Sequence, residues 1–191
     1  MPGAFLVGNR VQLRPLEESD ADILTAWIND PEIRRCLLFR VPYSVRAEKE
    51  WIASLSSGTA HPRQVALGIE LRHEPRLIGT VGLHGIDWIH RRAMTGIFLS
   101  PPELRGQGYG TEAKNLILDY AFGELGLHSL STHVFADNVA SIRSVERQGY
   151  RRAGVLRQAT YVKGRWVDNV VFDILAEEWR ALRAGSDDAD R

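Results

Sequence analysis

Apolar and polar residues alternate in four runs along the first half of the chain, and such alternation predicts half-buried strands. These strands are expected at residues 10–16, 63–71, 76–87 and 92–100. The last three are joined by short turns, so they are expected to pair as antiparallel neighbours. Between the first two strands, apolar residues at helical spacing predict helices capped by Ser19 and Ser44, with a short helix after Pro31 between them.

The second half of the chain passes from strand to helix periodicity and back. Five apolar or aromatic residues form one stripe of a predicted helix that Gly126 can end: Ala113, Leu116, Ile117, Tyr120 and Ala121. The elements expected after it are a strand at 129–136, a helix capped by Asp137 or Asn138 and ended by Gly149, a hairpin at 150–175, and a short helix at 176–182. Because a helix crosses between strands 92–100 and 129–136, these strands are predicted to be parallel neighbours.

Composition narrows the classes of protein to which the chain can belong. Lys and Arg number 24, as do Asp and Glu, and the net charge of zero argues against a dedicated nucleic-acid binder. The single cysteine, Cys36, excludes an internal disulfide framework and a cysteine-based zinc cage. No apolar run is long enough to span a membrane, and the N-terminus lacks the features of a secretory signal, so a cytoplasmic protein is expected. One domain at 1–183 and a disordered polar tail at 184–191 are predicted.

Three glycines alternate at the start of the helix that follows strand 92–100: Gly106, Gly108 and Gly110. Glycine accepts positive φ, and the first N–H groups of a helix have no internal partner, so the segment is suited to bind a phosphate. A Walker loop would need a lysine followed by Ser or Thr, and a dinucleotide fingerprint would need its third glycine one residue later. On the glycines alone, a tight turn without a ligand stays an equal alternative.

Several segments of the chain, taken together, favour a ligand-binding loop over a simple turn because they occur in the order found in one protein family. "RGQGYG" resembles the R/Q-x-x-G-x-G/A segment of the GCN5-related N-acetyltransferases (GNAT). "TEAKNLILDYAFGELGL", "NVASIRSVERQGY" and the closing "GVLRQATYVKGRWVDNVVFDILAEEW" are similar to the ribosomal-protein (RimJ/RimL-like) branch of that family, as is the opening "WINDPEIRR". The resemblance implies an α/β fold with a single mixed, mostly antiparallel, twisted sheet of about seven strands. It also implies a central parallel pair that splays apart, and helices on both faces.

The resemblance implies acetyl-CoA as co-substrate and no metal. It places the pyrophosphate on the glycine loop and the pantetheine arm between the splayed strands, near Asn138 and Ser141. The backbone N–H groups of 97–99 are expected to polarise the thioester carbonyl. The implied cofactor-binding residues are Ile97, Phe98, Leu99, Arg105, Gly106, Gln107, Gly108, Tyr109, Gly110, Thr111, Asn138 and Ser141. Asn138 can equally be a helix N-cap, and Ser141 an ordinary first-turn serine.

Two positions depart from the wider family. Where relatives carry a tyrosine as acid for the leaving thiolate this chain has Val145, and where they carry a glutamate base it has Met94. Ser141 is therefore the candidate acid and Asp87 the candidate base, although Asp87 also fits a turn residue. His84 and His133 are the other candidate bases, and a water chain or an acceptor of low amine pKa would remove the need for one.

The acceptor site is expected at the first helical region and the final hairpin, with residues Phe39, Tyr43, Trp88, Tyr161, Trp166 and Asp168. An aromatic stripe is more often a feature of a core than of a pocket, and Asp168 fits a hairpin ion pair equally well. The acidic segment around Glu17, Glu18 and Asp20 could attract a cation, but the helix dipole alone explains it.

The predicted function is acetyl-CoA-dependent N-acetylation of a primary amine, by direct attack in a ternary complex. An α-amine of a peptide or protein, a polyamine, and an aminoglycoside or amino sugar are the competing acceptors. A non-catalytic acyl-CoA-binding module is the alternative of another class, because Met94 and Val145 replace the usual acid and base. A monomer and a homodimer are both compatible with the sequence, and no nucleic-acid or membrane partner is expected.

Overall fold

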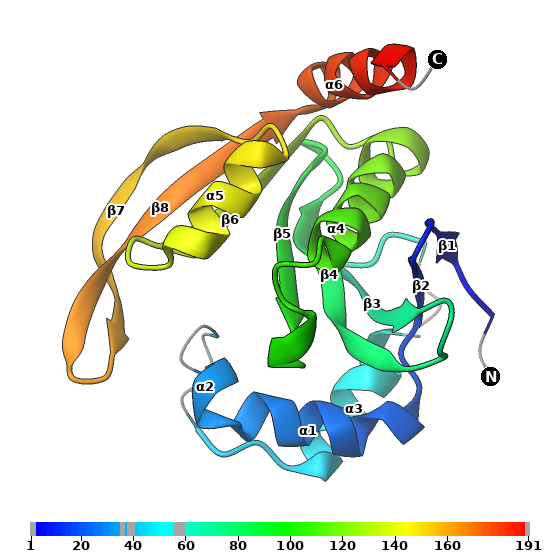
Figure 1. Ribbon diagram of the computed structural model, residues 1–191. Coiled ribbons are helices and arrows are strands. Elements are labelled where there is room, and N and C mark those ends of the chain that lie inside the picture. Colours follow the sequence, from blue (N-terminus) through cyan, green and yellow to red (C-terminus); the bar gives the residue numbers. More distant parts are fainter. Residues whose placement is uncertain (1–2, 35–36, 38–40, 56–59, 190–191) are drawn as a thin grey trace. The chain divides into compact units, whose positions relative to one another are not determined.

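The computed structural model describes residues 3–34, 37, 41–55 and 60–189 (Figure 1). Two compact units divide the chain, and they share strands β4 and β5 and helix α4. Unit 1 comprises Met1–Leu83 and Ile97–Leu116, and unit 2 comprises His84–Gly96 and Ile117–Arg191.

Eight strands form one sheet in the order β1-β2-β3-β4-β5-β6-β8-β7. Their bounds are β1 Leu6–Val7, β2 Val11–Pro15, β3 Gln64–Leu71, β4 Leu77–Asp87, β5 Arg92–Leu99, β6 Ser129–Phe135, β7 Arg151–Val162 and β8 Arg165–Leu175. The predicted mixed, mostly antiparallel sheet is confirmed. The resemblance implied about seven strands, and the structure has eight. The element that periodicity did not predict is β1, which with two residues is too short to produce a pattern.

The predicted parallel pair is β5 with β6. Its register joins the first three residues of each strand, Arg92–Met94 with Ser129–Ser131. Strand β6 also pairs antiparallel with β8, from Ser129 opposite Leu175 to Phe135 opposite Asn169. The crossover rule therefore identified the correct strand pair from the sequence.

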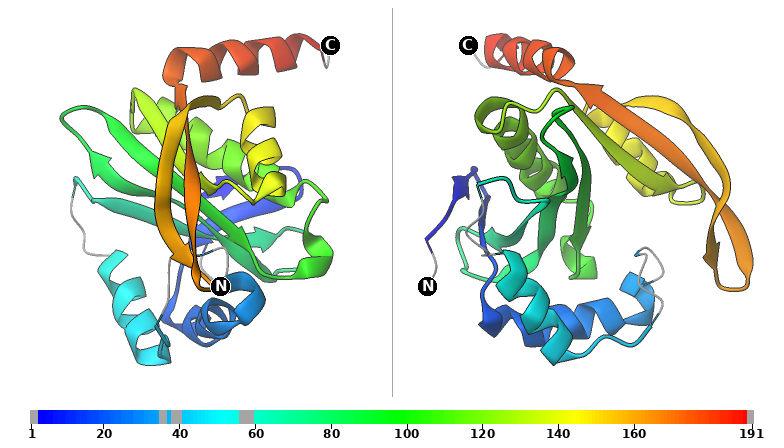
Figure 2. Two further views of the ribbon diagram at one scale, coloured as in Figure 1. Left: turned by 90° about the vertical axis from the view of Figure 1, so that its left-hand side faces the viewer. Right: turned by 180° about the vertical axis from the view of Figure 1, so that it is seen from behind.

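The helical region of unit 1 follows β2 and contains η1 Glu18–Asp20, α1 Ala21–Asn29, α2 Pro31–Arg34 and α3 Val45–Leu55. These helices lie beside one another in Figures 1 and 2. Ser44 caps α3 as predicted, since its hydroxyl accepts a hydrogen bond from the N–H of Ala47 at 3.2 Å. A buried apolar cluster joins the helices to strands β3 and β4: Leu16, Ala21, Leu24, Ile52, Ala66 and Leu77. Phe98 of β5 packs against this cluster.

The end of β5 leads through a short helical turn, η2 Pro102–Leu104, into the glycine loop and then into α4 Tyr109–Asp119. In unit 2, α4 continues as a π-helical turn, Tyr120–Glu124, and the chain then reverses at Gly126, whose φ is +61°. The sequence had predicted this helix stop, because glycine tolerates the left-handed conformation.

The remaining elements of unit 2 are α5 Val139–Arg147, the β7–β8 hairpin and α6 Ala176–Ala189. Figure 2 shows β7 and β8 extending together as one long hairpin. Its turn is Lys163–Gly164, both with positive φ, as a two-residue type I′ turn requires. Helix α6 continues to Ala189, so residues 184–189 extend a helix where the sequence predicted a disordered tail. Adding residues to an existing helix needs no new nucleus.

Candidate functional site

The glycine loop has the backbone conformation that the sequence predicted for an anion site. Gly106 has φ +75° and Gly108 has φ +88°, values that residues with a side chain rarely adopt. At Gly106 an added Cβ would meet no atom within 4 Å, whereas at Gly108 it would lie 2.8 Å from Nη2 of Arg10. Gly110 has an ordinary φ, but an added Cβ there would lie 3.2 Å from Cδ1 of Leu99. The first two glycines are therefore needed for conformation, and the third for close packing on β5.

The backbone N–H groups of this loop are open donors. Among the described residues, the N–H groups of Gln107, Gly108, Tyr109 and Gly110 donate to no backbone acceptor, while the N–H of Glu112 donates to the carbonyl of Gly108 at 3.0 Å as the helix begins. The helix dipole adds partial positive charge at this end of α4. Together, these donors and this dipole fit a phosphate group.

Arg105, predicted to help hold the phosphate, also supports the loop. Its Nε donates to the carbonyl of Leu99 at 3.3 Å and its Nη2 to the carbonyl of Ser100 at 3.2 Å. A guanidinium has five N–H donors, so these two bonds leave others for a ligand. The side chain of Gln107 is bound to the carbonyl of Glu103 at 2.6 Å. Both side chains fix the path of the chain into the loop.

The partner of this loop is the turn between β1 and β2, which no pattern in the sequence indicated. The carboxylate of Glu112, in the first turn of α4, accepts hydrogen bonds from the backbone N–H of Arg10 at 2.8 Å and of Val11 at 3.3 Å. Gly8 leaves room for this carboxylate, since an added Cβ would lie 2.5 Å from its Oε1. The Arg10 side chain in turn contacts three residues of the loop and helix: Gln107, Tyr109 and Glu112.

The other predicted residues of unit 1 lie on two elements. Ile97, Phe98 and Leu99 form the end of β5, where the ring of Phe98 packs edge-on against Trp27 with 6.2 Å between centroids. The backbone of Tyr43 is clamped by the Asn29 side chain, which donates to its carbonyl at 2.8 Å and accepts from its N–H at 2.9 Å. Thr111 lies in the first turn of α4. Phe39, the remaining predicted acceptor residue of this region, lies outside the described residues.

Two buried ionisable groups of unit 1 were not anticipated. Glu48 of α3 is 1% exposed, its Oε1 has no hydrogen-bond partner among the described residues, and burial raises its pKa to about 7. Lys114 of α4 is 2% exposed, and burial lowers its pKa to about 7. The burial of Glu48 could have been predicted from the sequence, because this charged residue lies between Val45 and Ile52 in the apolar stripe of α3.

In unit 2, Asn138 is the N-cap of α5. Its side-chain oxygen accepts a hydrogen bond from the N–H of Ser141 at 3.1 Å, so the structural alternative for Asn138 is confirmed. The carboxamide nitrogen of Asn138 is not used by this cap. Ser141 is half-buried in the first turn of α5, and Val145 is buried one turn further along.

A buried pair of hydroxyls in unit 2 involves Tyr150, which follows the α5 segment that carries Ser141 and Val145. The hydroxyl of Tyr150 lies 2.8 Å from that of Thr95 in β5, and Tyr150 is 3% exposed. Thr132 of β6 donates to the carbonyl of Thr95 at 3.1 Å. Burial raises the pKa of Tyr150, with the hydrogen bond from Thr95 acting in the opposite direction. These contacts link β5 and β6 to the residue that precedes β7, and they favour a structural role for Tyr150.

Asp87 has the contacts of a turn residue. Its carboxylate accepts from the N–H of His90 at 2.9 Å, lies 2.9 Å from Nδ1 of the same histidine, and lies 3.4 Å from Nε of Arg92. The backbone hydrogen bond from His90, followed by the other contacts, lowers the pKa of Asp87 to about 2. A carboxylate with such a pKa is a weak proton acceptor at neutral pH. The general-base role of Asp87 stays a prediction, but its surroundings favour the turn.

His84 lies against the strand that carries Gly96. A Cβ added to Gly96 would be 3.1 Å from Nε2 of His84, so the glycine leaves room for the imidazole beside β5. A glycine inside a strand is typical of a bulge or of a close approach by a neighbouring group, and here the neighbouring group is the imidazole of His84. His84 is solvent-exposed, as is His133, the third candidate base.

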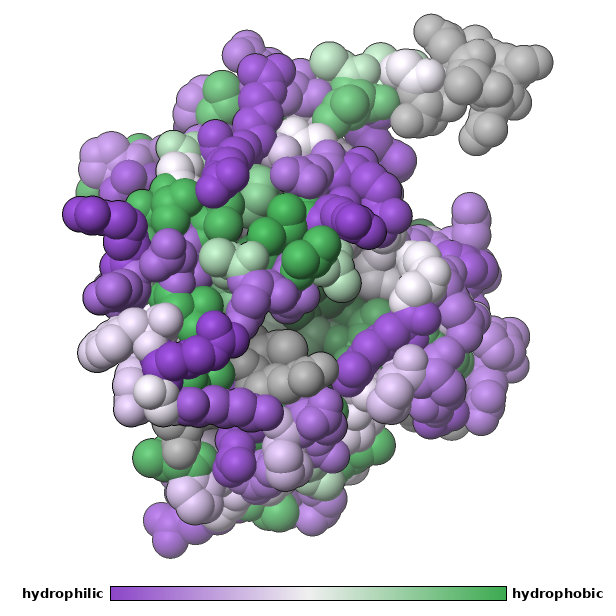
Figure 3. Space-filling model, turned by 60° about the vertical axis from the view of Figure 1, so that its left-hand side comes forward, coloured by the Kyte–Doolittle hydropathy of each residue, from purple (hydrophilic) through white to green (hydrophobic). Residues whose placement is uncertain are grey.

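The predicted acceptor residues of unit 2 lie in the turn after β4 and on the β7–β8 hairpin. Trp88 is half-buried in that turn. The rings of Tyr161 and Trp166 face each other across the hairpin, with 5.2 Å between centroids, and are 54% and 60% exposed. Asp168 accepts a hydrogen bond from the N–H of Gln158 at 2.7 Å, a contact internal to the hairpin. The face of the molecule drawn in Figure 3 presents hydrophobic side chains among hydrophilic ones.

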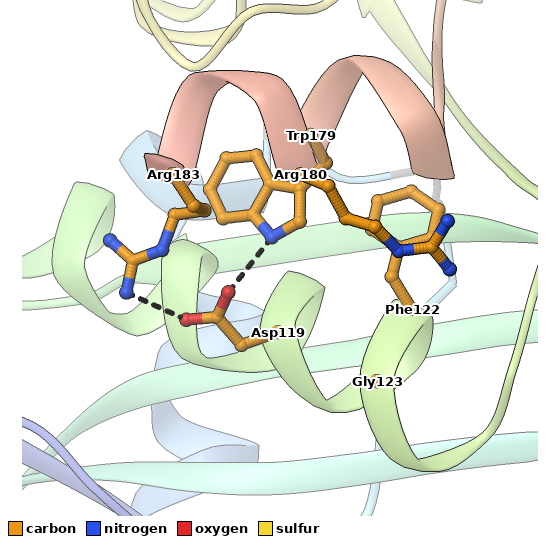
Figure 4. Close-up of a pocket in the computed structure, with 6 residues that line it drawn as sticks. All are labelled: Asp119, Phe122, Gly123, Trp179, Arg180 and Arg183. Atoms are coloured by element: carbon orange, nitrogen blue, oxygen red, sulfur yellow. Dashed lines mark hydrogen bonds and ion pairs between the residues drawn. The ribbon is translucent and has the colours of Figure 1, made fainter. Parts of the chain in front are cut away.

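A pocket of about 210 Å³ in unit 2 contains none of the predicted site residues. Figure 4 shows its lining residues, which come from the end of α4, the π-helical turn and α6. The Asp119 carboxylate accepts from Nε1 of Trp179 at 2.8 Å and from Nη2 of Arg183 at 3.1 Å, so this charge is paired within the pocket. Within the described part of the chain, no three His, Cys, Asp or Glu residues gather in a way that could hold a metal ion. The helices of that part are too short or too polar to cross a membrane.

Comparison with known proteins adds the following similarities. A family model described as an acetyltransferase (GNAT) domain matches residues 10–151. The chain is 32% identical over 171 residues to "Uncharacterized N-acetyltransferase YoaA" of Bacillus subtilis (strain 168), covering 90% of this chain and 96% of that protein. It is 31% identical over 182 residues to "Putative ribosomal N-acetyltransferase YdaF" of the same organism, covering 91% of this chain and 95% of that protein.

Polyamine acetyltransferases are also among the similar proteins. The spermidine N(1)-acetyltransferase of Vibrio cholerae serotype O1 is 29% identical over 162 residues, covering 85% of this chain and 91% of that protein. The crystal structure of spermidine N-acetyltransferase from Vibrio cholerae in complex with CoA and spermine matches with a TM-score of 0.81 and 28% identity. That match covers 90% of this chain and 99% of the solved one.

Proposed function

The chain belongs to the GNAT acetyltransferase family, and we propose that it acetylates a primary amine by direct attack in a ternary complex, with the α-amine of a peptide or protein as its preferred acceptor. Family membership makes it an N-acetyltransferase that uses acetyl-CoA, which supplies the acetyl thioester. An enzyme is thereby favoured over the non-catalytic module that Met94 and Val145 had left open.

The glycine loop carries the proposal. The loop offers four N–H donors that have no backbone acceptor among the described residues, two glycines with positive φ, and the start of helix α4. Together these features fit the pyrophosphate of acetyl-CoA. Arg105 adds a positive charge beside it. On β5, the backbone N–H groups of Ile97–Leu99 are assigned to the thioester carbonyl, where they would stabilise the charge that develops on its oxygen.

In unit 2, Asn138 and Ser141 are assigned to the pantetheine and sulfur end of the co-substrate. The cap leaves the carboxamide nitrogen of Asn138 as a donor, so capping and ligand binding are compatible. Ser141 is the proposed proton donor to the leaving thiolate, directly or through a water. A thiol has a pKa near ~8.5, so its thiolate needs only modest help to leave.

His84 is a better candidate than Asp87 for the proton acceptor. The Asp87 carboxylate is held by His90 and Arg92, and its low pKa makes it a weak base. An imidazole has an ordinary pKa near ~6.5, which suits a general base at neutral pH. The imidazole of His84 lies beside Gly96, the residue that precedes Ile97–Leu99 in β5.

The ion pairs of the acidic residues favour an α-amine over a polyamine as the acceptor. A polyamine carries several positive charges and needs unpaired carboxylates to bind. Three acidic side chains near the predicted acceptor elements have partners of their own: Asp20 with Arg14 at 2.8 Å, Asp87 with Arg92 at 3.4 Å, and Asp137 with Arg165. Asp20 is also buried, which removes it from the acidic segment that could have attracted a cation.

The ease of removing a proton from the acceptor also favours an α-amine. An N-terminal amine has a pKa of about 7.7–8.0 against about 10.4 for a lysine-type amine, so at pH 7 its neutral fraction is more than about 100-fold larger. A site whose nearest carboxylate is a weak base favours the more acidic ammonium. The similarity to the spermidine acetyltransferases of Vibrio cholerae keeps a polyamine as the second candidate.

A competition assay tests the acceptor. CoA release is measured at one pH with acetyl-CoA and either an N-terminal peptide or spermidine, and the two acceptors are ranked by kcat/KM. We expect the peptide to be preferred; a clear preference for spermidine overturns the ranking. The same assay on His84→Gln and Asp87→Asn tests the base. We expect a large loss of kcat at neutral pH only in His84→Gln, and the reverse result returns the role to Asp87.

A further inference from the structure

The Arg10 side chain contacts three residues of the glycine loop and α4, although it lies on the turn before β2, and a Cβ added to Gly108 would also meet it. Its Nη1 donates to the carbonyl of Gln107 at 2.9 Å, and its Nε lies 3.3 Å from Oε2 of Glu112. Its Cζ lies 4.7 Å above the ring of Tyr109, and its Nη2 is beside Gly108. All of these residues belong to unit 1.

The bond to Gln107 determines the direction of one peptide group. The peptide between Gln107 and Gly108 is trans, so its carbonyl and its N–H point in opposite directions. Because the carbonyl is held toward Arg10, the N–H of Gly108 is turned away from Arg10. Glycines with positive φ lie on both sides of Gln107, so little else restricts rotation of this peptide.

Glu112 restricts the guanidinium in turn. Its Oε1 accepts from the backbone N–H groups of Arg10 and Val11, and its Oε2 faces Nε of Arg10. One carboxylate in the first turn of α4 therefore holds both the backbone and the side chain of Arg10. The arginine fork matches this arrangement because its N–H groups lie in one plane, with Nε toward Glu112 and Nη1 toward Gln107.

From this geometry we infer that Arg10 is a positioning residue for the pyrophosphate of acetyl-CoA, and that it acts by fixing the Gln107–Gly108 peptide with its N–H available to the phosphate. This inference rests on the proposed function of the glycine loop. A rotated peptide would present the Gln107 carbonyl to the phosphate, and a carbonyl oxygen repels an anion where an N–H attracts it. Loss of Arg10 therefore weakens binding of the nucleotide end of the co-substrate and not of its acyl end.

The test compares two acetyl donors, acetyl-CoA and acetyl-pantetheine, of which the second lacks the pyrophosphate. Their KM values are measured for the wild type, Arg10→Met, Arg10→Lys and Arg72→Met, and the acetyl-CoA Kd is measured by calorimetry. Arg72 is the matched control, because its Nη1 supports the same turn through the carbonyls of Gly8 at 2.7 Å and Asn9 at 3.2 Å. The structure gives no contact between Arg72 and the glycine loop among the described residues.

We expect Arg10→Met to weaken acetyl-CoA binding by about tenfold or more, as loss of a charged hydrogen-bonding group typically does. Its KM for acetyl-pantetheine should stay at the wild-type value, and Arg72→Met should resemble the wild type with both donors. Arg10→Lys should recover only part of the loss, since an ammonium lacks the planar fork.

Three results overturn the inference. Unchanged acetyl-CoA affinity in Arg10→Met removes the role of Arg10, and an equal loss with both donors makes it a general stability effect. Full recovery in Arg10→Lys shows that charge alone acts at this position. Failure of the wild type to bind acetyl-CoA is a separate outcome, since it refutes the proposed use of the loop and this inference with it.

Discussion

The hydroxyls of Tyr150 and Thr95 lie 2.8 Å apart in the interior of unit 2, where they join the segment after α5 to strand β5. Tyr150 follows Gly149, the residue that ends the helix carrying Ser141. It is the tyrosine nearest to the position where related enzymes carry their acid, yet burial raises its pKa and its hydroxyl is occupied.

The first prediction is that Tyr150→Phe lowers stability and leaves catalysis intact. Loss of one buried hydrogen bond costs about 1 kcal/mol, because the Thr95 hydroxyl then keeps only its 3.4 Å contact with the Ser131 carbonyl. Urea denaturation measures the loss, with Tyr161→Phe as the exposed control that should unfold like the wild type. A large fall in kcat at saturating substrates in Tyr150→Phe would instead make Tyr150 the acid.

The second prediction separates two glycines of the loop. Gly108→Val should abolish detectable acetyl-CoA binding, because a β-branched residue is strained at φ +88° and its Cβ lies against Arg10. Gly106→Ala should cost about 1–3 kcal/mol of stability from its positive φ but retain binding, since nothing surrounds the new Cβ. Calorimetry on folded variants measures both. Equal affinities in the two variants would contradict the loop as the pyrophosphate site.

The third prediction concerns the leaving thiolate. Ser141→Ala should lower kcat by about 10²-fold, the low end of the range for acid–base groups, because a thiolate is already a fair leaving group. Saturating acetyl-CoA and amine isolate this step from binding. Ser144→Ala, one turn from Ser141 on the same helix, is the control expected to retain activity. Full activity in Ser141→Ala would remove this serine from the mechanism.

The fourth prediction follows from Glu48. Burial raises its pKa to about 7 from the ordinary 4.5, so the folded protein keeps a proton on Glu48 that the unfolded chain releases. Stability from this group is therefore complete below about pH 4.5 and is lost as the pH rises to about 7. The difference of about 2.5 pKa units corresponds to at most about 3 kcal/mol.

Glu48→Gln cannot ionise, so its stability relative to the wild type should rise across this pH interval and be constant outside it. Denaturant unfolding at several pH values measures the difference, and groups common to both proteins cancel. The slope is the relevant quantity, because the amide of glutamine adds a constant cost of its own in a buried site. A difference that does not change between pH 4.5 and 8 would mean that Glu48 ionises normally in the folded protein.

The sequence by itself determined the elements and the chemical nature of the loop. Periodicity predicted the longer strands and helices, and the crossover rule predicted the pairing of β5 with β6. The glycines before α4 indicated a segment that permits positive φ, which Gly106 and Gly108 adopt. These features depend on the conformational preferences of residues that are close together in the sequence, so a local pattern is enough to predict them. The caps at Ser44 and Asn138 were predictable for the same reason.

Only the tertiary structure decided which distant residues meet. Arg10 and Glu112 are separated by 102 positions, and no local pattern indicates that they pair. The same holds for His84 beside Gly96, for the burial of Asp20 with Arg14, and for the two-residue strand β1, which exists only through its register with β2. In the sequence Asp87 fitted both a general base and a turn residue, and only the structure shows the contacts with His90 and Arg92 that lower its pKa and make it a weak base. The ionisation and accessibility of a polar side chain depend on the groups that folding brings to it, so they are properties of the packed chain and not of its sequence pattern.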